Sequence, residues 1–183
     1  MGQERRAVSG ALGIPRSKSE RFSSWLSDML DEVTNADQLQ IRTLKDSEVD
    51  TVTRYLGLAR LYQGNGAYLV AWIDELPVGH AYLTRTDPPQ LQDVEVLSAS
   101  RRQGIAHKLV AAVEETARER GACALRVSMS ARDPDVQRLY RSLGFVDVGI
   151  APLEVHGIIS IRTGPIDVDD TLLTWEKAIL DAK

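Results

Sequence analysis

Chemistry is first suggested by a short cationic turn, Ser100–Lys108, with the sequence SRRQGIAHK. Two arginines and a glycine stand there between an apolar run and the start of an amphipathic helix. The first N–H groups of a helix have no partner within the helix, and the helix dipole favours negative charge at that end. Gly104 and Ala106 are small enough to let a phosphate approach the main chain, and Arg101 and Arg102 add local positive charge. The turn therefore predicts a phosphate-ester site.

A second segment, DPDVQRLYRSLGF, follows the next predicted strand and ends at Phe145. The first turn fits neither a Walker loop, GxxxxGK followed by Ser or Thr, nor the GxGxxG of a dinucleotide fold. Taken together, the two segments resemble the GNAT N-acetyltransferase superfamily. Residues Arg101–Ala106 are similar to its pyrophosphate loop, R/Q-x-x-G-x-G/A, and the second segment is similar to its N-x-x-A-x-x-L-Y-x-x-x-G-F pattern. The resemblance covers residues 41–175.

The resemblance implies acetyl-CoA as a co-substrate that lies in a gap between the fourth and fifth strands. Its pantetheine arm would pair with the main chain of the fourth strand, where a bulge often frees an N–H group for the thioester oxygen. Asp133 stands where the family commonly has Asn, and it keeps the ability to cap a helix. The residues expected to contact acetyl-CoA are Val96, Leu97, Arg101, Arg102, Gln103, Gly104, Ile105, Ala106, His107, Asp133 and Tyr140.

Transfer to an amine needs a base, since a lysine-like amine has a pKa of about 10.4. Glu95 and Asp93 are the candidates. They alternate with Val94 and Val96, which places both carboxylates on one side of the strand, away from the apolar face. Carboxylates that are only solvated or salt-bridged are the alternative. The resemblance makes Tyr140 the acid that protonates the departing CoA thiolate, whereas without it a helical tyrosine is a packing residue.

The remaining reactive side chains give weaker signals. Cys123, flanked by apolar residues, is typical of a core residue rather than a nucleophile. The three histidines, His80, His107 and His156, are too scattered to suggest a metal site, so no metal is predicted. Three acidic residues near the C-terminus fit either a solvated loop or a surface that attracts a cationic substrate; they are Asp167, Asp169 and Asp170.

The elements that position these residues follow from hydrophobic periodicity. The order is strand, helix, three strands, helix, strand, helix and further strands. This order predicts an α/β fold with a mixed, mostly antiparallel sheet of six to seven strands and helices on both faces. The first of these helices is expected at 46–59 and the second at 106–120. The segments FVDVGIA and TLLTWEK are expected strands, and residues 152–170 either extend the sixth strand or form a separate one.

Length and charge bound the remaining possibilities. Residues 1–36 are expected to form a tail and an extra amphipathic helix, which packs on its own domain or forms a homodimer contact. Residues 37–183 are expected to form the acetyltransferase domain. A net charge of -4 argues against general nucleic-acid binding, and no apolar run of about 18 residues offers a membrane span. The single cysteine fits a reducing cytoplasm.

These inferences predict an N-acetyltransferase that moves an acetyl group from acetyl-CoA to a primary amine of a small molecule by direct attack. Two alternatives stay open. The acceptor is an amine of a protein or peptide, or the chain is a non-catalytic acyl-CoA-binding regulatory module. Release of free CoA in the presence of amines would separate the enzyme from the module.

Overall fold

A computed structural model of the chain describes residues 39–61, 64–161 and 164–179. The expected tail and N-terminal helix within residues 1–36 lie outside the described residues. None of the helices in the described ranges is long and apolar enough to cross a membrane. The elements in chain order are β1 (Gln40–Thr43), η1 (Asp46–Glu48), α2 (Val49–Thr53), β2 (Gly66–Ile73), β3 (Leu76–Thr84), β4 (Gln90–Val96), η2 (Ser98–Ser100), α3 (Ile105–Glu119), β5 (Ala124–Ser130), α4 (Pro134–Ser142), β6 (Val146–Asp147), β7 (Leu153–Ile161) and β8 (Gly164–Ala178).

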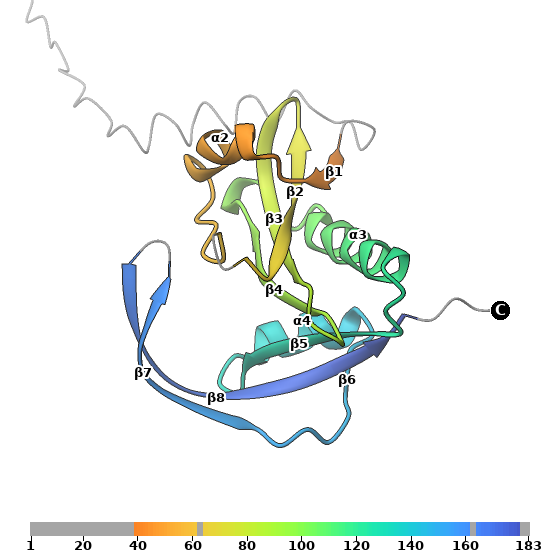
Figure 1. The fold of residues 1–183 in the computed structure, drawn as a ribbon, viewed down its shortest axis with the longest axis vertical. Helices are drawn as coiled ribbons and strands as arrows, with labels where there is room; N and C mark the ends of the chain where they lie inside the picture. The colour runs from red at the N-terminus through yellow and green to blue at the C-terminus, as the bar shows by residue number, and fades with distance from the viewer. Residues whose placement is uncertain (1–38, 62–63, 162–163, 180–183) are drawn as a thin grey trace, which may run out of the picture. The chain divides into compact units, whose positions relative to one another are not determined.

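The described strands form one eight-stranded sheet with the order β1-β2-β3-β4-β5-β8-β6, and β7 pairs with β8 (Figure 1). Every pair of neighbours is antiparallel except β4 and β5, which run parallel. Those two strands are in register at only two positions, Gln90 opposite Arg126 and Leu91 opposite Val127. Beyond Leu91 they no longer pair. The expected gap between the fourth and fifth strands is therefore confirmed, in a sheet with one strand more than the upper expected number.

Helices cover both faces of the sheet, as predicted. The apolar stripe of α3 packs on one face, and its buried residues are Ile105, Leu109, Val110, Val113 and Ala117. On the other face, Val52 of α2 and the following Leu56 pack against side chains of β2 and β3, namely Tyr68, Val70, Trp72 and Tyr82. Each helix is placed by the period-2 alternation of the strands beneath it, which sends successive side chains to opposite faces. The sheet thus separates two apolar clusters.

The helix expected at 46–59 is much shorter in the structure. A short 3-10 turn, η1, leads into α2, which ends at Thr53. Every residue of α2 other than Asp50 is β-branched, which lowers helix propensity, and Leu58 adopts a φ of 46° after Gly57. Beyond Thr53 the chain is no longer helical. Leu56 and Leu58 are nevertheless fully buried in the apolar cluster that contains Val52.

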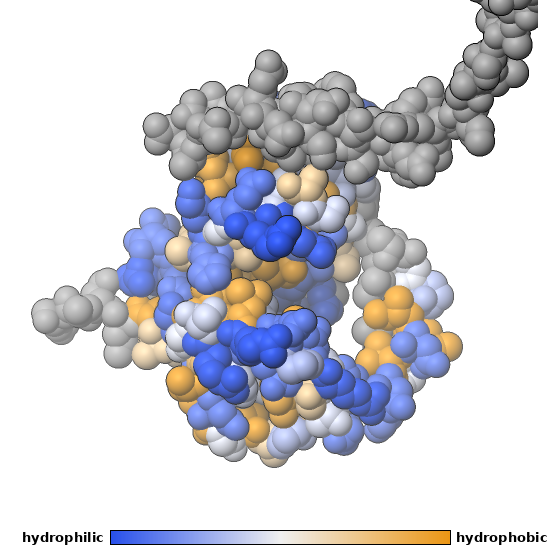
Figure 2. All heavy atoms as spheres, turned by 180° about the vertical axis from the view of Figure 1, so that it is seen from behind, coloured by the Kyte–Doolittle hydropathy of each residue, from blue (hydrophilic) through white to orange (hydrophobic). Residues whose placement is uncertain are grey.

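The C-terminal strands also differ from expectation. Only β6 remains of the strand expected at FVDVGIA, because the Asp147 carboxylate accepts a hydrogen bond from the Gly149 N–H at 2.8 Å and Gly149 adopts a φ of 78°. Of the two expectations for residues 152–170, the separate strand is confirmed: β7 pairs in a hairpin with the first part of β8. Apolar side chains gather near the end of that hairpin in Figure 2, where Ile158 and Ile166 are 76% and 41% exposed.

Candidate functional site

β4 carries a bulge at the centre of the site. On β3, His80 lies opposite Glu95. Two residues further along β3, Tyr82 lies opposite Gln92, so β4 fits one extra residue between the two pairs. Asp93 marks this bulge with a φ of 48°, a conformation that Asp tolerates better than most residues. The bulge interrupts regular pairing with β3 just after β4 has separated from β5.

The two candidate carboxylates differ in their surroundings. The Asp93 carboxylate accepts hydrogen bonds from the Tyr68 hydroxyl and, at 3.1 Å, from the Ala59 N–H. Burial, together with that carboxylate, raises the pKa of Tyr68. Glu95 is 44% exposed and lies 3.4 Å from Nε2 of His80, whose ring packs edge-on against Tyr68. Both carboxylates lie on the side of β4 that faces Tyr68, as the alternation predicts, and Glu95 is the more exposed of the two residues.

The main chain at the end of β4 presents one residue to the gap. The Leu97 N–H donates to the Val78 carbonyl on β3 at 2.9 Å, and the Leu97 carbonyl accepts from the Ser100 N–H at 2.8 Å. Because main-chain polar groups alternate in direction along a strand, those of Val96 point toward β5. The Val96 carbonyl accepts from Nε of Arg101 at 3.0 Å, which leaves the Val96 N–H facing the gap. Leu97 is therefore paired within the protein, whereas the main-chain N–H of Val96 faces the gap.

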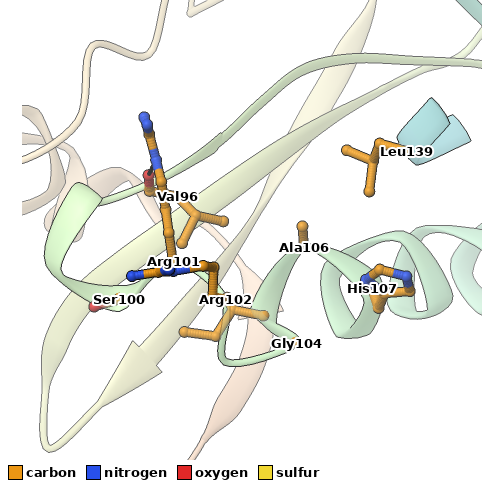
Figure 3. Close-up of a pocket in the computed structure, with 9 residues that line it drawn as sticks. Val96, Ser100, Arg101, Arg102, Gly104, Ala106, His107 and Leu139 are labelled. Atoms are coloured by element: carbon orange, nitrogen blue, oxygen red, sulfur yellow. Dashed lines mark hydrogen bonds between the residues drawn. The ribbon is translucent and has the colours of Figure 1, made fainter. Parts of the chain in front are cut away.

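The turn before α3 exposes a row of N–H groups. Arg102 and Gly104 adopt φ values of 63° and 76°, and Gly104 is the N-cap of α3. None of the main-chain N–H groups from Arg102 to Ala106 donates to another described residue. Several donors therefore point outward at the positive end of a helix 15 residues long, as an anion site requires. Figure 3 shows Arg101, Arg102 and His107 around this turn.

The opposite wall is α4. Asp133 caps this helix by accepting from the N–H groups of Asp135 and Val136 at 3.1 and 3.0 Å, as its position in the sequence predicts. Tyr140 is 7% exposed and packs edge-on against Phe145 at 5.5 Å between ring centroids. Its hydroxyl makes no hydrogen bond with another described residue, and burial raises the pKa of Tyr140 to about 12. The phenol therefore stays protonated across the physiological range.

One groove joins these parts. It has a volume of about 740 Å³, and its walls come from β4, the turn and α4. A smaller hollow of about 320 Å³ lies over the turn itself, where Ala106 and Leu139 point toward one another (Figure 3). The predicted site residues that line one or both spaces are Glu95, Val96, Arg101, Arg102, Gly104, Ile105, Ala106, His107, Asp133 and Tyr140. Leu97 and Gln103 line neither.

Some residues of the site were not among the predicted ones. Val136 and Leu139 line the groove beside Tyr140, and their spacing on α4 could have indicated a shared face. His80 had no local signal, because its position behind Glu95 depends on the register between two strands.

Comparison with known proteins places this geometry in a family. The sequence model of the acetyltransferase (GNAT) family matches residues 28–145, which is more than half of the chain. The chain belongs to the GNAT acetyltransferase family. No curated protein sequence matched it.

Solved GNAT structures share the fold at low sequence identity. A ribosomal-protein alanine N-acetyltransferase from Escherichia coli is 15% identical with a TM-score of 0.61, and the match covers 79% of this chain and 96% of that one. A spermidine/spermine N-acetyltransferase from Vibrio cholerae is 12% identical with a TM-score of 0.59, covering 78% and 93%. The protein yncA from Salmonella typhimurium, solved with its cofactor acetyl-CoA, is 16% identical with a TM-score of 0.57, covering 79% and 96%. The acceptors of the first two differ in kind, so the shared fold fixes no acceptor.

Proposed function

We propose that this GNAT protein transfers an acetyl group from acetyl-CoA to a primary amine of a small molecule by direct attack. The observation that carries the proposal is the single groove in which the anion-binding turn, Glu95 and Tyr140 meet. Acetyl-CoA supplies the activated acetyl group as a thioester. The residues of this chain bind it, orient it and move protons.

The turn fits the diphosphate of acetyl-CoA. Its unpaired N–H groups form charge-assisted hydrogen bonds with phosphate oxygens, and Arg101 and Arg102 add positive charge at the same place. His107 lies at the edge of this hollow. The pantetheine arm then runs along the unpaired edge of β4, where the Val96 N–H faces the gap. This path directs the thioester toward the groove that Glu95 and Tyr140 line.

Glu95 is the proposed base. It is the candidate carboxylate that the groove exposes, whereas Asp93 holds the bulge through Tyr68 and Ala59. An ammonium group must lose a proton before its nitrogen can attack, and Glu95 accepts that proton directly or through water. The negative charge of Glu95 also favours a cationic acceptor at this wall of the groove.

Tyr140 is the proposed acid. Its hydroxyl has no partner among the described residues, and its raised pKa keeps the proton available at neutral pH. A CoA thiolate, with a thiol pKa near 8.5, leaves more readily when a neutral phenol donates a proton to the sulfur. The acid and the base thus lie on opposite walls of one groove.

The test has a binding arm and a turnover arm. Titration calorimetry of the folded protein should show binding of acetyl-CoA and of CoA. Release of free CoA should then rise with at least one member of an amine panel that includes polyamines, aminoglycosides, amino acids and peptide N-termini. Turnover with peptides alone would replace the small-molecule assignment, and binding without amine-stimulated release would make the chain a regulatory acyl-CoA-binding module.

A carboxylate control accompanies that test. Glu95→Gln should lower turnover by about 100-fold near pH 7, within the usual range for loss of a general base. Glu119 is an exposed carboxylate near the far end of α3, so Glu119→Gln changes the net charge equally without entering the groove. Equal turnover of the two variants would remove Glu95 from the mechanism.

A further inference from the structure

His80 is a fully buried histidine directly behind the proposed base. It is 0% exposed and lies on β3, with its ring edge-on to Tyr68 at 5.0 Å between centroids. Nδ1 lies 2.8 Å from the main-chain carbonyl oxygen of Asp93, the residue at the bulge. A carbonyl oxygen only accepts hydrogen bonds, so Nδ1 carries a hydrogen. The bulge therefore fixes which tautomer the neutral ring adopts.

The second ring nitrogen faces Glu95. Nε2 is buried without a hydrogen-bond partner of good geometry, and the nearest acidic oxygen is Oε2 of Glu95 at 3.4 Å. With Nδ1 protonated, a neutral ring presents only a lone pair at Nε2. A lone pair and an ionised carboxylate cannot hydrogen-bond to each other, but one proton between them satisfies both. The contact is therefore built for a single shared proton.

We infer that His80 is a positioning residue that forms a one-proton pair with Glu95, and that this pair, rather than Glu95 alone, takes the proton from the acceptor amine. The inference rests on the proposed function and extends it. An isolated glutamate carboxylate has an ordinary pKa of about 4.3. It is therefore a weak acceptor for a proton from a lysine-like amine, whose pKa is about 10.4. A carboxylate that shares the proton with an imidazole nitrogen holds it between two acceptors instead of one.

The other ionisable groups around His80 leave this pair isolated. From β4, the Asp93 carboxylate is turned toward the Tyr68 hydroxyl and the Ala59 N–H. From β2, the Tyr68 hydroxyl is neutral because its pKa is raised. The proton that arrives on Glu95 is therefore stabilised mainly by Nε2.

The reaction balances as follows. The acceptor ammonium gives one proton to Glu95, where it is shared with Nε2 of His80. The free amine nitrogen forms a bond to the acetyl carbonyl carbon, and the carbon–sulfur bond breaks. The thiolate takes a proton from Tyr140, and Tyr140 regains one from the nitrogen, which becomes an amide. The pair then loses its proton to solvent, so one proton is released for each acetyl group transferred.

The first test needs no substrate. In full-length protein with ¹⁵N-labelled imidazoles, NMR should find the hydrogen of the His80 ring on Nδ1, and the Nε2 resonance should shift in Glu95→Gln, because the carboxylate that faces this nitrogen is removed. Glu95 is half-exposed, so this variant keeps the fold. The exposed His107 and His156 serve as internal references. A hydrogen on Nε2 instead, or an Nε2 resonance that Glu95→Gln leaves unchanged, would overturn the pair.

The second test separates the pair from a structural role of the histidine. The amide nitrogen of an asparagine replaces Nδ1, so His80→Asn keeps the donation to the Asp93 carbonyl and loses Nε2 together with the ring contact to Tyr68. We expect kcat/KM near pH 7 to fall at least tenfold and its acid limb to move to lower pH, with acetyl-CoA affinity unchanged. An acid limb identical to wild type would contradict the inference. Absence of turnover with every amine would count against the proposed function, while the NMR result would still decide the pair.

Discussion

Replacing Gly104 by Ala tests the anion-binding turn most directly. Gly104 has a φ of 76°, and a Cβ added there meets no atom within 4 Å. The substitution is therefore strained only by the backbone conformation, which costs an L-residue roughly 1 kcal/mol. The chain offers a matched control at the other end of α3, where Gly121 has a φ of 81° and also meets no atom within 4 Å. Both variants should lose about 1 kcal/mol of stability, a fall of roughly 2–4 °C in Tm.

Their affinities for acetyl-CoA should differ. Any shift of φ at Gly104 turns the adjacent N–H groups away from the diphosphate, and losing one charge-assisted hydrogen bond costs about 1.5–3 kcal/mol. Gly104→Ala should then bind acetyl-CoA roughly 10- to 150-fold more weakly, whereas Gly121→Ala should bind like wild type. Titration calorimetry, with thermal unfolding as the check on folding, measures both effects. Equal affinity of the two variants would refute the assignment of the turn.

Two other residues give further predictions. Tyr140→Phe should slow turnover about 100-fold at unchanged acetyl-CoA affinity, measured by CoA release and calorimetry. Burial raises the pKa of Tyr140 from 10.0 to about 12, so the folded state keeps a proton that the unfolded chain releases. Its contribution to stability is thus full below pH 10.0 and is lost as the pH rises toward about 12; urea unfolding should show a smaller alkaline loss in Tyr140→Phe. Asp133→Ala should lower stability by about 1 kcal/mol through loss of the α4 cap, whereas Asp133→Asn should not, as thermal unfolding can measure.

Local patterns predicted the elements whose boundaries carry their own signals. α3 begins and ends within one residue of expectation because Gly104 and Gly121 flank a strongly amphipathic run. Asp133 was expected to cap α4 and does so with two hydrogen bonds. In each case the information lies within a few residues of the feature, so tertiary contacts were not needed to find it.

Features that depend on distant pairing could not be found in this way. The apolar positions after α2 suggested a longer helix, but Leu56 and Leu58 are buried by β2 and β3 without helical geometry. Residues 152–170 contain too many charged residues and glycines for clear alternation, and the strands there are defined by the pairing of β7 with the first part of β8. His80 lies in an apolar run, and nothing near it in the sequence indicates that Glu95 lies opposite.

Because β4 and β5 pair at only two positions, few hydrogen bonds oppose separation of the sheet between these strands. β5 shares seven positions with β8, so the hydrogen-bonded connection between the two halves of the sheet is narrow by comparison. A ligand that occupies the gap would contact both halves, and its binding free energy would add to the free energy that keeps them together. At a ligand concentration 100 times Kd this addition is about 2.7 kcal/mol. Amide hydrogen exchange where β4 pairs with β5 should therefore become slower as the ligand concentration rises.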